Sequence, residues 1–417
     1  MNKIRLVLIL WLFAITITFA TQPLKIAHIT DVHFLSSSLV DEGDAYNNFV
    51  RATGRNTADL HEVLNVVLTD LINEKIDILL ISGDITNHGE QQSHLDFIEK
   101  LRPLKAQGTR VFVVPGNHDI NVPTARAFIG NTSAPVQTIS AEEFTQLYAD
   151  FGYSEALKKD IHSLSYLTVI NDSVWLLAFD TNRYAEYTTR TISSGRILPQ
   201  TLAWALDILQ KAEEKGIIVL GMMHHNIVEH IPLQATFFAD YLIDDWQQIA
   251  EIFADAGLKV VFTGHFHTNS VSLRTSIAGN TIYDVQTASL AQYPFAYRIM
   301  DLKSNELHID TRFVASIPRN FNLEATYRQK LTEITRRTAQ NRLRTLGMPI
   351  PEMMQNALTD VIVNLNLLHV RGDGAPDNEL LQFIRTFAGL LGNEIDMSEF
   401  NFDFPSANNQ LTIRLKD

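Results

Sequence analysis

Along most of the chain, short runs of apolar residues alternate with longer stretches that carry apolar side chains at helical spacing. The runs at residues 24–30, 76–81 and 110–114 are continuous and end in polar residues, which is typical of buried strands. Residues 58–73 have an apolar residue every three or four positions and predict a helix, and a second helix is expected up to about residue 105. This alternation predicts an α/β domain.

The pattern continues, less regularly, through the middle of the chain. A hairpin is predicted by two strand-like runs around a short polar turn, at residues 166–170 and 174–179. Further strands are expected at 217–222 and 258–262, and helices at 141–150, 198–214 and 241–256. Four strand-like runs then follow at 271–275, 281–285, 297–302 and 306–314, and we expect them to form a second sheet. Two irregular stretches are interpreted as a loop over the strand ends (34–56) and a lid or flank (120–164).

Beyond residue 316 the pattern becomes mainly helical. Helices are predicted at 323–346, 352–368 and 378–391, followed by a closing strand at 411–415. We therefore divide the chain into a domain of residues 21–315 and a C-terminal region of residues 316–417, expected to act as a helical cap or a dimer contact. Seven Lys or Arg residues stand between Arg319 and Arg344. A solvated face is the favoured interpretation of this basic run, and contact with anionic lipid or a substrate phosphate is the alternative.

The N-terminus has the features of a targeting segment. Lys3 and Arg5 precede an apolar run over residues 6–20, with small residues at plausible cleavage positions. This run is shorter than the ~20 residues that usually span a membrane. We expect residues 1–20 to be a cleaved signal peptide, with an N-terminal anchor as the less favoured option, and the protein to be exported to the periplasm or secreted.

Composition narrows the chemistry. The chain has 417 residues with 46% hydrophobic and 19% charged residues, which is enough apolar material for a large core and shows no signature of disorder. Its formal charge of −13 argues against binding of a nucleic-acid polymer, because phosphate-backbone affinity depends on clustered Lys and Arg. There is no cysteine, so disulfides, thiolate ligands and a cysteine nucleophile are excluded. Any metal must be held by His, Asp, Glu or Asn.

Polar clusters follow five of the apolar runs. They contain Asp31 and His33, Asp84, Asn117 with His118 and Asp119, His224 and His225, and His265 and His267. Taken alone, most of these clusters would be ordinary turns or helix caps. The His265 and His267 pair is more suggestive, since alternate residues of an extended segment place both imidazoles on one side. Carboxylate, amide and imidazole groups together are the ligands that a dinuclear metal centre needs.

In order and in residue type, these clusters resemble the calcineurin-like metallophosphoesterase family over residues 24–315. The resemblance implies a four-layer α/β sandwich of two mixed sheets flanked by helices, here with a mainly helical C-terminal extension. It implies two divalent or trivalent metal ions bridged by Asp84. Asp31, His33 and His267 would complete one site, and Asn117, His224 and His265 the other. Ligand identity does not choose among Mn, Fe and Zn, because imidazole and carboxylate ligands suit all three.

The resemblance also implies roles for the two residues after Asn117. His118 would steady the transition state and protonate the leaving oxygen, with Asp119 orienting its ring. His28 and His225 are interpreted as structural. Asn87 stands where purple acid phosphatases carry a tyrosine ligand, which disfavours that branch.

The expected function is metal-dependent hydrolysis of a small phosphoester by a dinuclear centre and a metal-bound hydroxide. The Asp-x-His opening and the paired histidines are most similar to the cyclic nucleotide and glycerophosphodiester phosphodiesterase branch, so a phosphodiesterase is favoured. A phosphomonoesterase, such as a nucleotidase or phosphoprotein phosphatase, and a non-catalytic interaction protein on the same fold are the alternatives. The substrate itself is not identified by the sequence.

Overall fold

A computed structural model describes residues 23–41, 43–231, 234–345, 351–372, 378, 381–382 and 408–416. The predicted signal peptide lies outside these residues, as does nearly all of the helix predicted at 378–391. No helix in the described part is long and apolar enough to cross a membrane.

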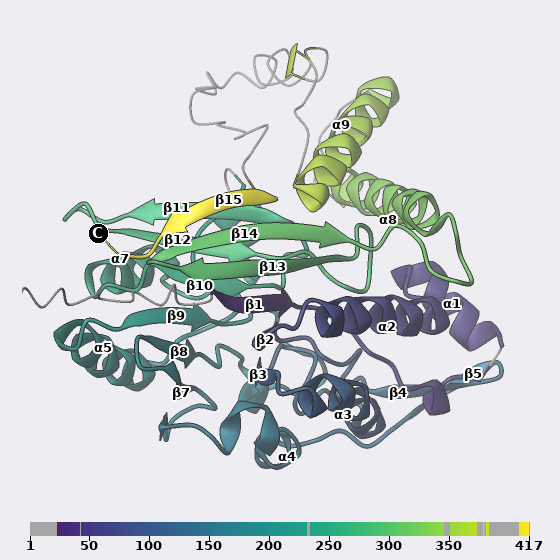
Figure 1. Cartoon of the computed structure of the whole chain (residues 1–417). Helices are drawn as coiled ribbons and strands as arrows, with labels where there is room; N and C mark the ends of the chain where they lie inside the picture. Colours follow the sequence, from purple (N-terminus) through teal and green to yellow (C-terminus); the bar gives the residue numbers. More distant parts are fainter. Residues whose placement is uncertain are drawn as a thin grey trace, which may run out of the picture.

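The first sheet has six strands in the order β15-β14-β13-β1-β2-β3 (Figure 1). Its strands are β1 (Leu24–Ile29), β2 (Ile78–Ser82), β3 (Arg110–Val114), β13 (Ala296–Lys303), β14 (Glu306–Phe313) and β15 (Gln410–Arg414). Strands β1, β2 and β3 are parallel, while β13, β14 and β15 are added in antiparallel pairs. The parallel strands are almost entirely buried, which explains their continuous apolar runs.

The second sheet has seven strands in the order β11-β12-β10-β9-β8-β7-β6. They are β6 (Lys158–Lys159), β7 (Tyr166–Asn171), β8 (Val174–Ala178), β9 (Ile218–Met222), β10 (Val260–Thr263), β11 (Ser270–Thr275) and β12 (Thr281–Gln286). The predicted hairpin is present as the antiparallel pair β7 and β8. A separate small pair is formed by β4 (Arg126–Ile129) and β5 (Thr132–Pro135).

The expectation that the four late strands build the second sheet by themselves is wrong. Strands β11 and β12 extend the sheet that contains β10, whereas β13 pairs with β1 and brings β14 into the first sheet. Strand β1 pairs with β2 along one of its edges, and the backbone groups of its other edge also need hydrogen-bond partners. Strand β13 provides them, with Ile26 opposite Met300.

Two hydrophobic cores separate the layers. In β10, Phe262 belongs to the core shared by both sheets, while its neighbour Val261 belongs to the core under the helices of the second sheet. This follows from the alternation of side chains along a strand. The outer helices are α2 (Thr57–Asn73) and α3 (Gln91–Ala106) on the first sheet, and α5 (Pro199–Glu214) and α7 (Trp246–Asp255) on the second. The predicted four-layer sandwich is thereby confirmed.

Several short elements connect the layers. The helices are α1 (Asp44–Thr53), α4 (Ala141–Leu147) and α6 (Gln234–Phe237), and single turns lie at Ser37–Leu39, Ala149–Tyr153, Tyr184–Glu186 and Ala239–Tyr241. Helix α1 lies where a loop was expected. Its Tyr46 and Phe49 pack against Phe128 of β4, a contact between distant segments that the local pattern did not indicate.

The C-terminal region contains α8 (Leu323–Thr345) and α9 (Glu352–Arg371), which pack against each other (Figure 1). Helix α8 lies next to α2, where the Tyr327 hydroxyl donates to the Asp59 carboxylate at 2.9 Å, and next to α1, where Arg337 donates to the Arg51 carbonyl at 3.5 Å. The predicted closing strand is β15, which pairs with β14 from Glu306 to Asp310. The region therefore supplies an edge strand of the first sheet as well as helices.

A protein that ends at Ser316 is expected to aggregate. It would lose β15 and so leave the backbone groups of β14 unpaired, and unpaired strand edges promote association. It would also expose Leu307 and Ile309, which are buried. Analytical ultracentrifugation of this protein and of the full chain measures the effect, and a monodisperse, fully active truncated protein would contradict it.

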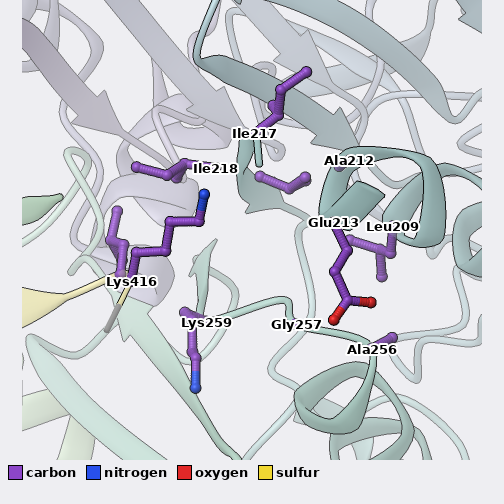
Figure 2. Close-up of a pocket in the computed structure, with 11 residues that line it drawn as sticks. Leu209, Ala212, Glu213, Ile217, Ile218, Ala256, Gly257, Lys259 and Lys416 are labelled. Carbon is purple, nitrogen blue, oxygen red and sulfur yellow. The ribbon is translucent and has the colours of Figure 1, made fainter. Parts of the chain in front are cut away.

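A pocket of about 300 Å³ opens at the amino end of β9, lined by Leu209, Ile217 and Ile218 with Glu213 and Lys259 nearby (Figure 2). The polar clusters of the sequence follow the opposite, carboxyl ends of these strands. The pocket therefore takes no part in the metal chemistry considered below.

Candidate metal centre

Each of the seven predicted metal ligands follows the carboxyl end of a parallel strand. Asp31 and His33 come after β1, Asp84 after β2, Asn117 after β3, His224 after β9, and His265 and His267 after β10. Carboxyl ends of parallel strands meet at one edge of a sheet, which is where open α/β sheets bind ligands. Strands β1, β2 and β3 belong to the first sheet, and β9 and β10 belong to the second. The predicted ligands therefore converge from both sheets.

One group of converging donors contains Asp31, His33, Asp84 and His267, whose ligand atoms lie within 4.8 Å of one another. His267 Nε2 is 3.0 Å from Asp31 Oδ1 and 3.3 Å from His33 Nε2. His33 Nε2 is in turn 3.7 Å from Asp84 Oδ2. These separations are those of atoms that surround a common point.

A second group contains Asp84, His224 and His265, again within 4.8 Å. His224 Nε2 is 3.5 Å from Asp84 Oδ1 and 3.1 Å from Asn117 Oδ1, which brings the predicted amide ligand to the same place. Asp84 belongs to both groups through its two carboxylate oxygens. This is the placement that a bridging ligand requires.

Neighbouring carbonyl groups orient two of the imidazoles. His224 Nδ1 donates to the Ser82 carbonyl at 2.8 Å, and His265 Nε2 donates to the Asp240 carbonyl at 3.1 Å. Each bond occupies one ring nitrogen and would leave the other nitrogen to serve as a metal ligand. Such bonds set the tautomer of metal-binding histidines.

The backbone at these positions is unusual. Five of the ligands, Asp31, His33, Asp84, His265 and His267, have positive φ between 43° and 70°. Side chains other than glycine adopt this left-handed region at a cost of about 1–3 kcal/mol each, and such strain is concentrated at functional sites. The turn at each strand end is what aims these side chains into the space between the sheets.

Two glycines allow the strand ends to approach. A Cβ atom at Gly116 would lie 2.2 Å from Asp84 Oδ1, and one at Gly264 would lie 2.4 Å from Asp31 Oδ2. No side chain fits at these distances. The glycines of both motifs are therefore required by close packing against the carboxylates.

The charges of the cluster favour cation binding. Burial alone would raise the pKa of the Asp84 carboxyl, but His224, His118 and His33 hold it well below its usual range. Burial, together with Arg55, keeps the pKa of His33 well below its ordinary value, so its ring is neutral. The result is an ionised carboxylate beside an imidazole with a free lone pair.

The donor set fits divalent metal ions. Two carboxylates, one amide oxygen and four imidazoles are hard and intermediate ligands of the type that Mn, Fe and Zn accept. In the described part of the chain, the buried His33 Nδ1 has no hydrogen-bond partner, while His33 Nε2 faces the other donors of its group. The residues that would hold the metals are thus already assembled by the fold.

His118 lies beside this cluster without belonging to either group. Its backbone N–H donates to Asp84 Oδ1 at 2.8 Å, and its ring is edge-on to that of His33 with centroids 5.2 Å apart. Nδ1 lies 3.0 Å from both the Asn87 carbonyl and His88 Nδ1. The ring is therefore anchored at Nδ1, which leaves Nε2 free for chemistry.

The expectation that Asp119 orients the His118 ring is wrong. The Asp119 carboxylate accepts backbone N–H groups from Gly116 at 2.7 Å, Thr86 at 2.8 Å and Ile85 at 3.1 Å. It joins the loop after β3 to the loop after β2 and so holds Asp84 near Asn117. The His118 ring takes its orientation from the Asn87 carbonyl, which its Nδ1 contacts at 3.0 Å, because the Asp119 carboxylate is already occupied by these backbone donors.

Replacing Asp119 by alanine is therefore expected to destabilise the fold. Three buried donors would lose their acceptor, and since each costs about 1–3 kcal/mol, the free energy of unfolding should fall by about 3 kcal/mol or more. Denaturant unfolding of the metal-free protein measures this, with the exposed Asp172→Ala as control. Unchanged stability together with slower turnover would instead restore the ring-orienting role.

Two histidines predicted to be structural are held by the protein at both ring nitrogens. His28 contacts the Thr287 and Ser82 hydroxyls at 2.7 and 2.8 Å, and His225 contacts the Thr181 hydroxyl and the Ser193 carbonyl at 2.7 and 2.9 Å. Neither ring has a nitrogen left for a metal.

The sequence interpretation missed two residues near the centre, His88 and Arg55. His88 stands inside the Gly-Asp-Ile-Thr-Asn-His-Gly segment at residues 83–89, and its proximity to a motif was a usable signal. Arg55 lies between two helices and had no local signal. By contrast, Arg183 and Arg196 both pair with Glu186.

The C-terminal region touches the last ligand loop. The ring of His369 in α9 packs against Phe266, which stands between His265 and His267, with centroids 5.7 Å apart. The Asn269 N–H donates to the Val370 carbonyl at 3.3 Å. Helix α9 thus supports the segment that carries two of the predicted ligands.

The model of the calcineurin-like phosphoesterase family matches residues 24–269, more than half of the chain. The chain belongs to the calcineurin-like phosphoesterase family. The family identified from the motifs is thereby confirmed, and the protein is a hydrolase that acts on phosphoesters. Metal dependence follows from the family together with the two groups of converging donors.

Similar proteins include two that are named probable cyclic nucleotide phosphodiesterases. One, from Coxiella burnetii, is 23% identical over 269 residues, covering 63% of this chain and 85% of the relative. The other, from Xenorhabdus bovienii, is 26% identical over 251 residues, covering 60% and 80%. Among solved structures, a dimetal phosphatase from Danio rerio is 12% identical with a TM-score of 0.49, covering 70% of this chain and 96% of that one.

Proposed function

We propose that this calcineurin-like phosphoesterase hydrolyses small phosphodiesters with two metal ions bridged by Asp84. The observation that carries the proposal is the position of Asp84, whose two oxygens face two separate groups of donors. When bound, a pair of metals supplies Lewis acidity toward a phosphoryl oxygen and lowers the pKa of water to about 7.

The remaining roles fall to the chain's own side chains. Asp31, His33 and His267 would hold one ion, and Asn117, His224 and His265 the other. His118 Nε2 would give a proton to the departing oxygen, because its Nδ1 is held by the Asn87 carbonyl and its ring lies beside that of the predicted ligand His33. Protonation matters since an alkoxide is a poor leaving group.

A preference of this protein for diesters is supported by the names of the two relatives described above, since the matches cover 85% and 80% of those proteins. Cyclic nucleotides are accordingly the first substrate class to test. The absence of a tyrosine at Asn87 supports a site other than that of purple acid phosphatases. Mn, Fe and Zn all suit the donor set.

The test is a substrate panel with the chain reconstituted separately with each of these metals. It contains a 3′,5′-cyclic nucleotide, an aryl phosphodiester and the matching aryl phosphomonoester, and kcat/KM is measured for each. We expect the diesters to be preferred. A preference for the monoester would favour a phosphatase, and no hydrolysis by a protein that binds metal stoichiometrically would favour the non-catalytic alternative.

A further inference from the structure

Arg55 lies on a short turn between two helices, and both of its neighbours are fixed. Gly54 ends α1 in the left-handed conformation with φ of 76°. Asn56 begins α2, where its side chain accepts the Asp59 N–H at 3.1 Å. The Arg55 N–H itself donates to the Thr53 hydroxyl at 3.1 Å. The backbone thus holds Arg55 in a defined place over the carboxyl edge of the first sheet.

The side chain of Arg55 reaches toward the metal ligands. It is partly buried, and its Nη1 donates to Asn87 Oδ1 at 3.4 Å. After burial, the charge of Arg55 is a cause of the lowered pKa of His33 and contributes to that of His118. The fields of Asp84 and Asp31 act on the guanidinium in return. Arg55 is therefore a cation beside both the predicted metal site and the predicted proton donor.

Arg55 has no ion-pair partner. No carboxylate of the described residues lies within 4.0 Å of its guanidinium, and Asn87 is its one side-chain acceptor among them. Other partly buried arginines in the described part are paired, for example Arg110 with Glu155 and Arg274 with Glu251. Removing a charge from water without a counter-ion is costly, so this position favours an anion that the protein does not itself supply.

The other charges nearby lead to the same expectation. In the metal-free protein, Arg55 balances part of the charge of Asp31 and Asp84. Two bound metal ions would exceed the charge of those two carboxylates, and the guanidinium would then add to an excess of positive charge. The buried Glu90 accepts the Asn87 amide N–H at 3.3 Å, and since burial raises the pKa of its carboxyl it offsets at most one unit of this excess. A phosphoryl group would offset part of the positive charge that remains.

We propose that Arg55 binds a non-bridging oxygen of the substrate's phosphoryl group, next to the metals. This inference rests on the proposed function and adds a residue to it. A guanidinium suits the task because its planar N–H groups match phosphate oxygens, and all but one of those groups lack a protein acceptor in the described part of the chain. The competing role is a brace, in which Arg55 serves to position Asn87 and, through its carbonyl, His118.

The decisive variant is Arg55→Met, which removes the charge and keeps much of the side-chain length. Arg51→Met is the matched control, since Arg51 is exposed near the end of α1, four residues before Arg55. Binding of inorganic phosphate to the metal-loaded proteins is measured by calorimetry. We expect Arg55→Met to weaken it roughly 10- to 100-fold, the range for a hydrogen bond to a charged group, and Arg51→Met to leave it within twofold.

Three further measurements separate binding from bracing. Metal content should be unchanged in Arg55→Met, because no ligand is lost. Its KM for an aryl phosphodiester should rise more than its kcat falls, and Arg55→Lys should recover part of the phosphate affinity because it restores the charge. Arg55→Lys also serves as the test should Arg55→Met fold poorly.

Phosphate affinity within twofold of wild type in Arg55→Met, or an equal loss in Arg51→Met, would overturn the proposal. A fall in kcat alone would also overturn it, since the loss of a brace for His118 would slow proton transfer without weakening phosphate binding. The proposed function fails separately. If the wild-type protein hydrolyses no phosphoester but binds phosphate through Arg55, the inference stands and the enzymatic assignment is wrong.

Discussion

Replacing Asp84 by asparagine is expected to lower kcat/KM by about 10³-fold or more, since bridged metals stabilise the transition state by several kcal/mol. Asn keeps the size of the side chain and one oxygen acceptor, so the bond from the His118 N–H can remain. What it loses is the charge and the second oxygen. An amide oxygen binds hard cations more weakly than a carboxylate and cannot hold two of them, so at least one metal should be lost.

The measurement pairs metal analysis with steady-state kinetics, and Asp41→Asn, which changes an exposed carboxylate, is the control. Metal-free Asp84→Asn should melt close to the metal-free wild type. Added metal should then raise the melting temperature of the wild type much more than that of the variant, because stabilisation by a ligand follows its affinity. Full activity with two bound metals would show that Asp84 is not a bridge.

Replacing His118 by asparagine is expected to reduce kcat by roughly 10²- to 10⁴-fold, the usual contribution of a general acid. Metal content should not change, because the His118 ring lies outside both groups of converging donors. The backbone N–H that donates to Asp84 is retained in the variant. The loss should be greatest for substrates with poor leaving groups, which depend most on protonation.

A pH profile adds an independent readout for His118. Burial lowers the pKa of His118 below its ordinary value, so the wild type should lose activity as the pH rises through a pKa below that of a free imidazole, and this limb should be absent in the variant. His308→Asn, which changes an exposed histidine of β14, controls for the removal of an imidazole. Loss of a metal ion in His118→Asn would instead make this residue a ligand, and wild-type turnover would remove it from the chemistry.

Neighbouring residues of the loop after β3 have different roles. The loop after β3 presents Asn117 and His118 to the site, while Asp119 is turned back to bind the loop after β2. The predicted effects differ accordingly: Asp119→Ala should lower the free energy of unfolding, and His118→Asn should lower kcat. Comparing them tests how the site is divided between structure and chemistry.

Much of the candidate centre could be predicted before the fold was known. A buried parallel strand must be apolar along its length, so a carboxylate, amide or imidazole directly after it can only lie at the sheet edge. Asp31, Asp84 and Asn117 were placed in this way from single apolar runs. The glycines before Asp84 and His265 marked the tight turns, and the structure shows the matching positive φ values at both residues.

Other features depended on contacts between segments far apart in the chain. Strand β13 pairs with β1 across more than 270 residues, so β13's own pattern could not say which sheet it joins. Helix α1 packs against the distant Phe128. The Asp119 carboxylate accepts hydrogen bonds from backbone N–H groups, which leave no signal in the sequence. Arg55 is the clearest case. The sequence shows that this residue carries a positive charge. Only the packing of α1 and α2 over the first sheet brings that charge to Asn87 and leaves it without a counter-ion among the described residues.

By itself, the sequence determined the identity of the chemical groups and the strand ends that carry them, because both are local properties of apolar runs and turns. The tertiary structure alone decided how those ends are paired, which oxygens of Asp84 face which group of donors, and which neighbouring side chains face toward the centre or away from it. These are set by strand pairing and by the approach of the two sheets, and such contacts leave no periodic trace in a single chain.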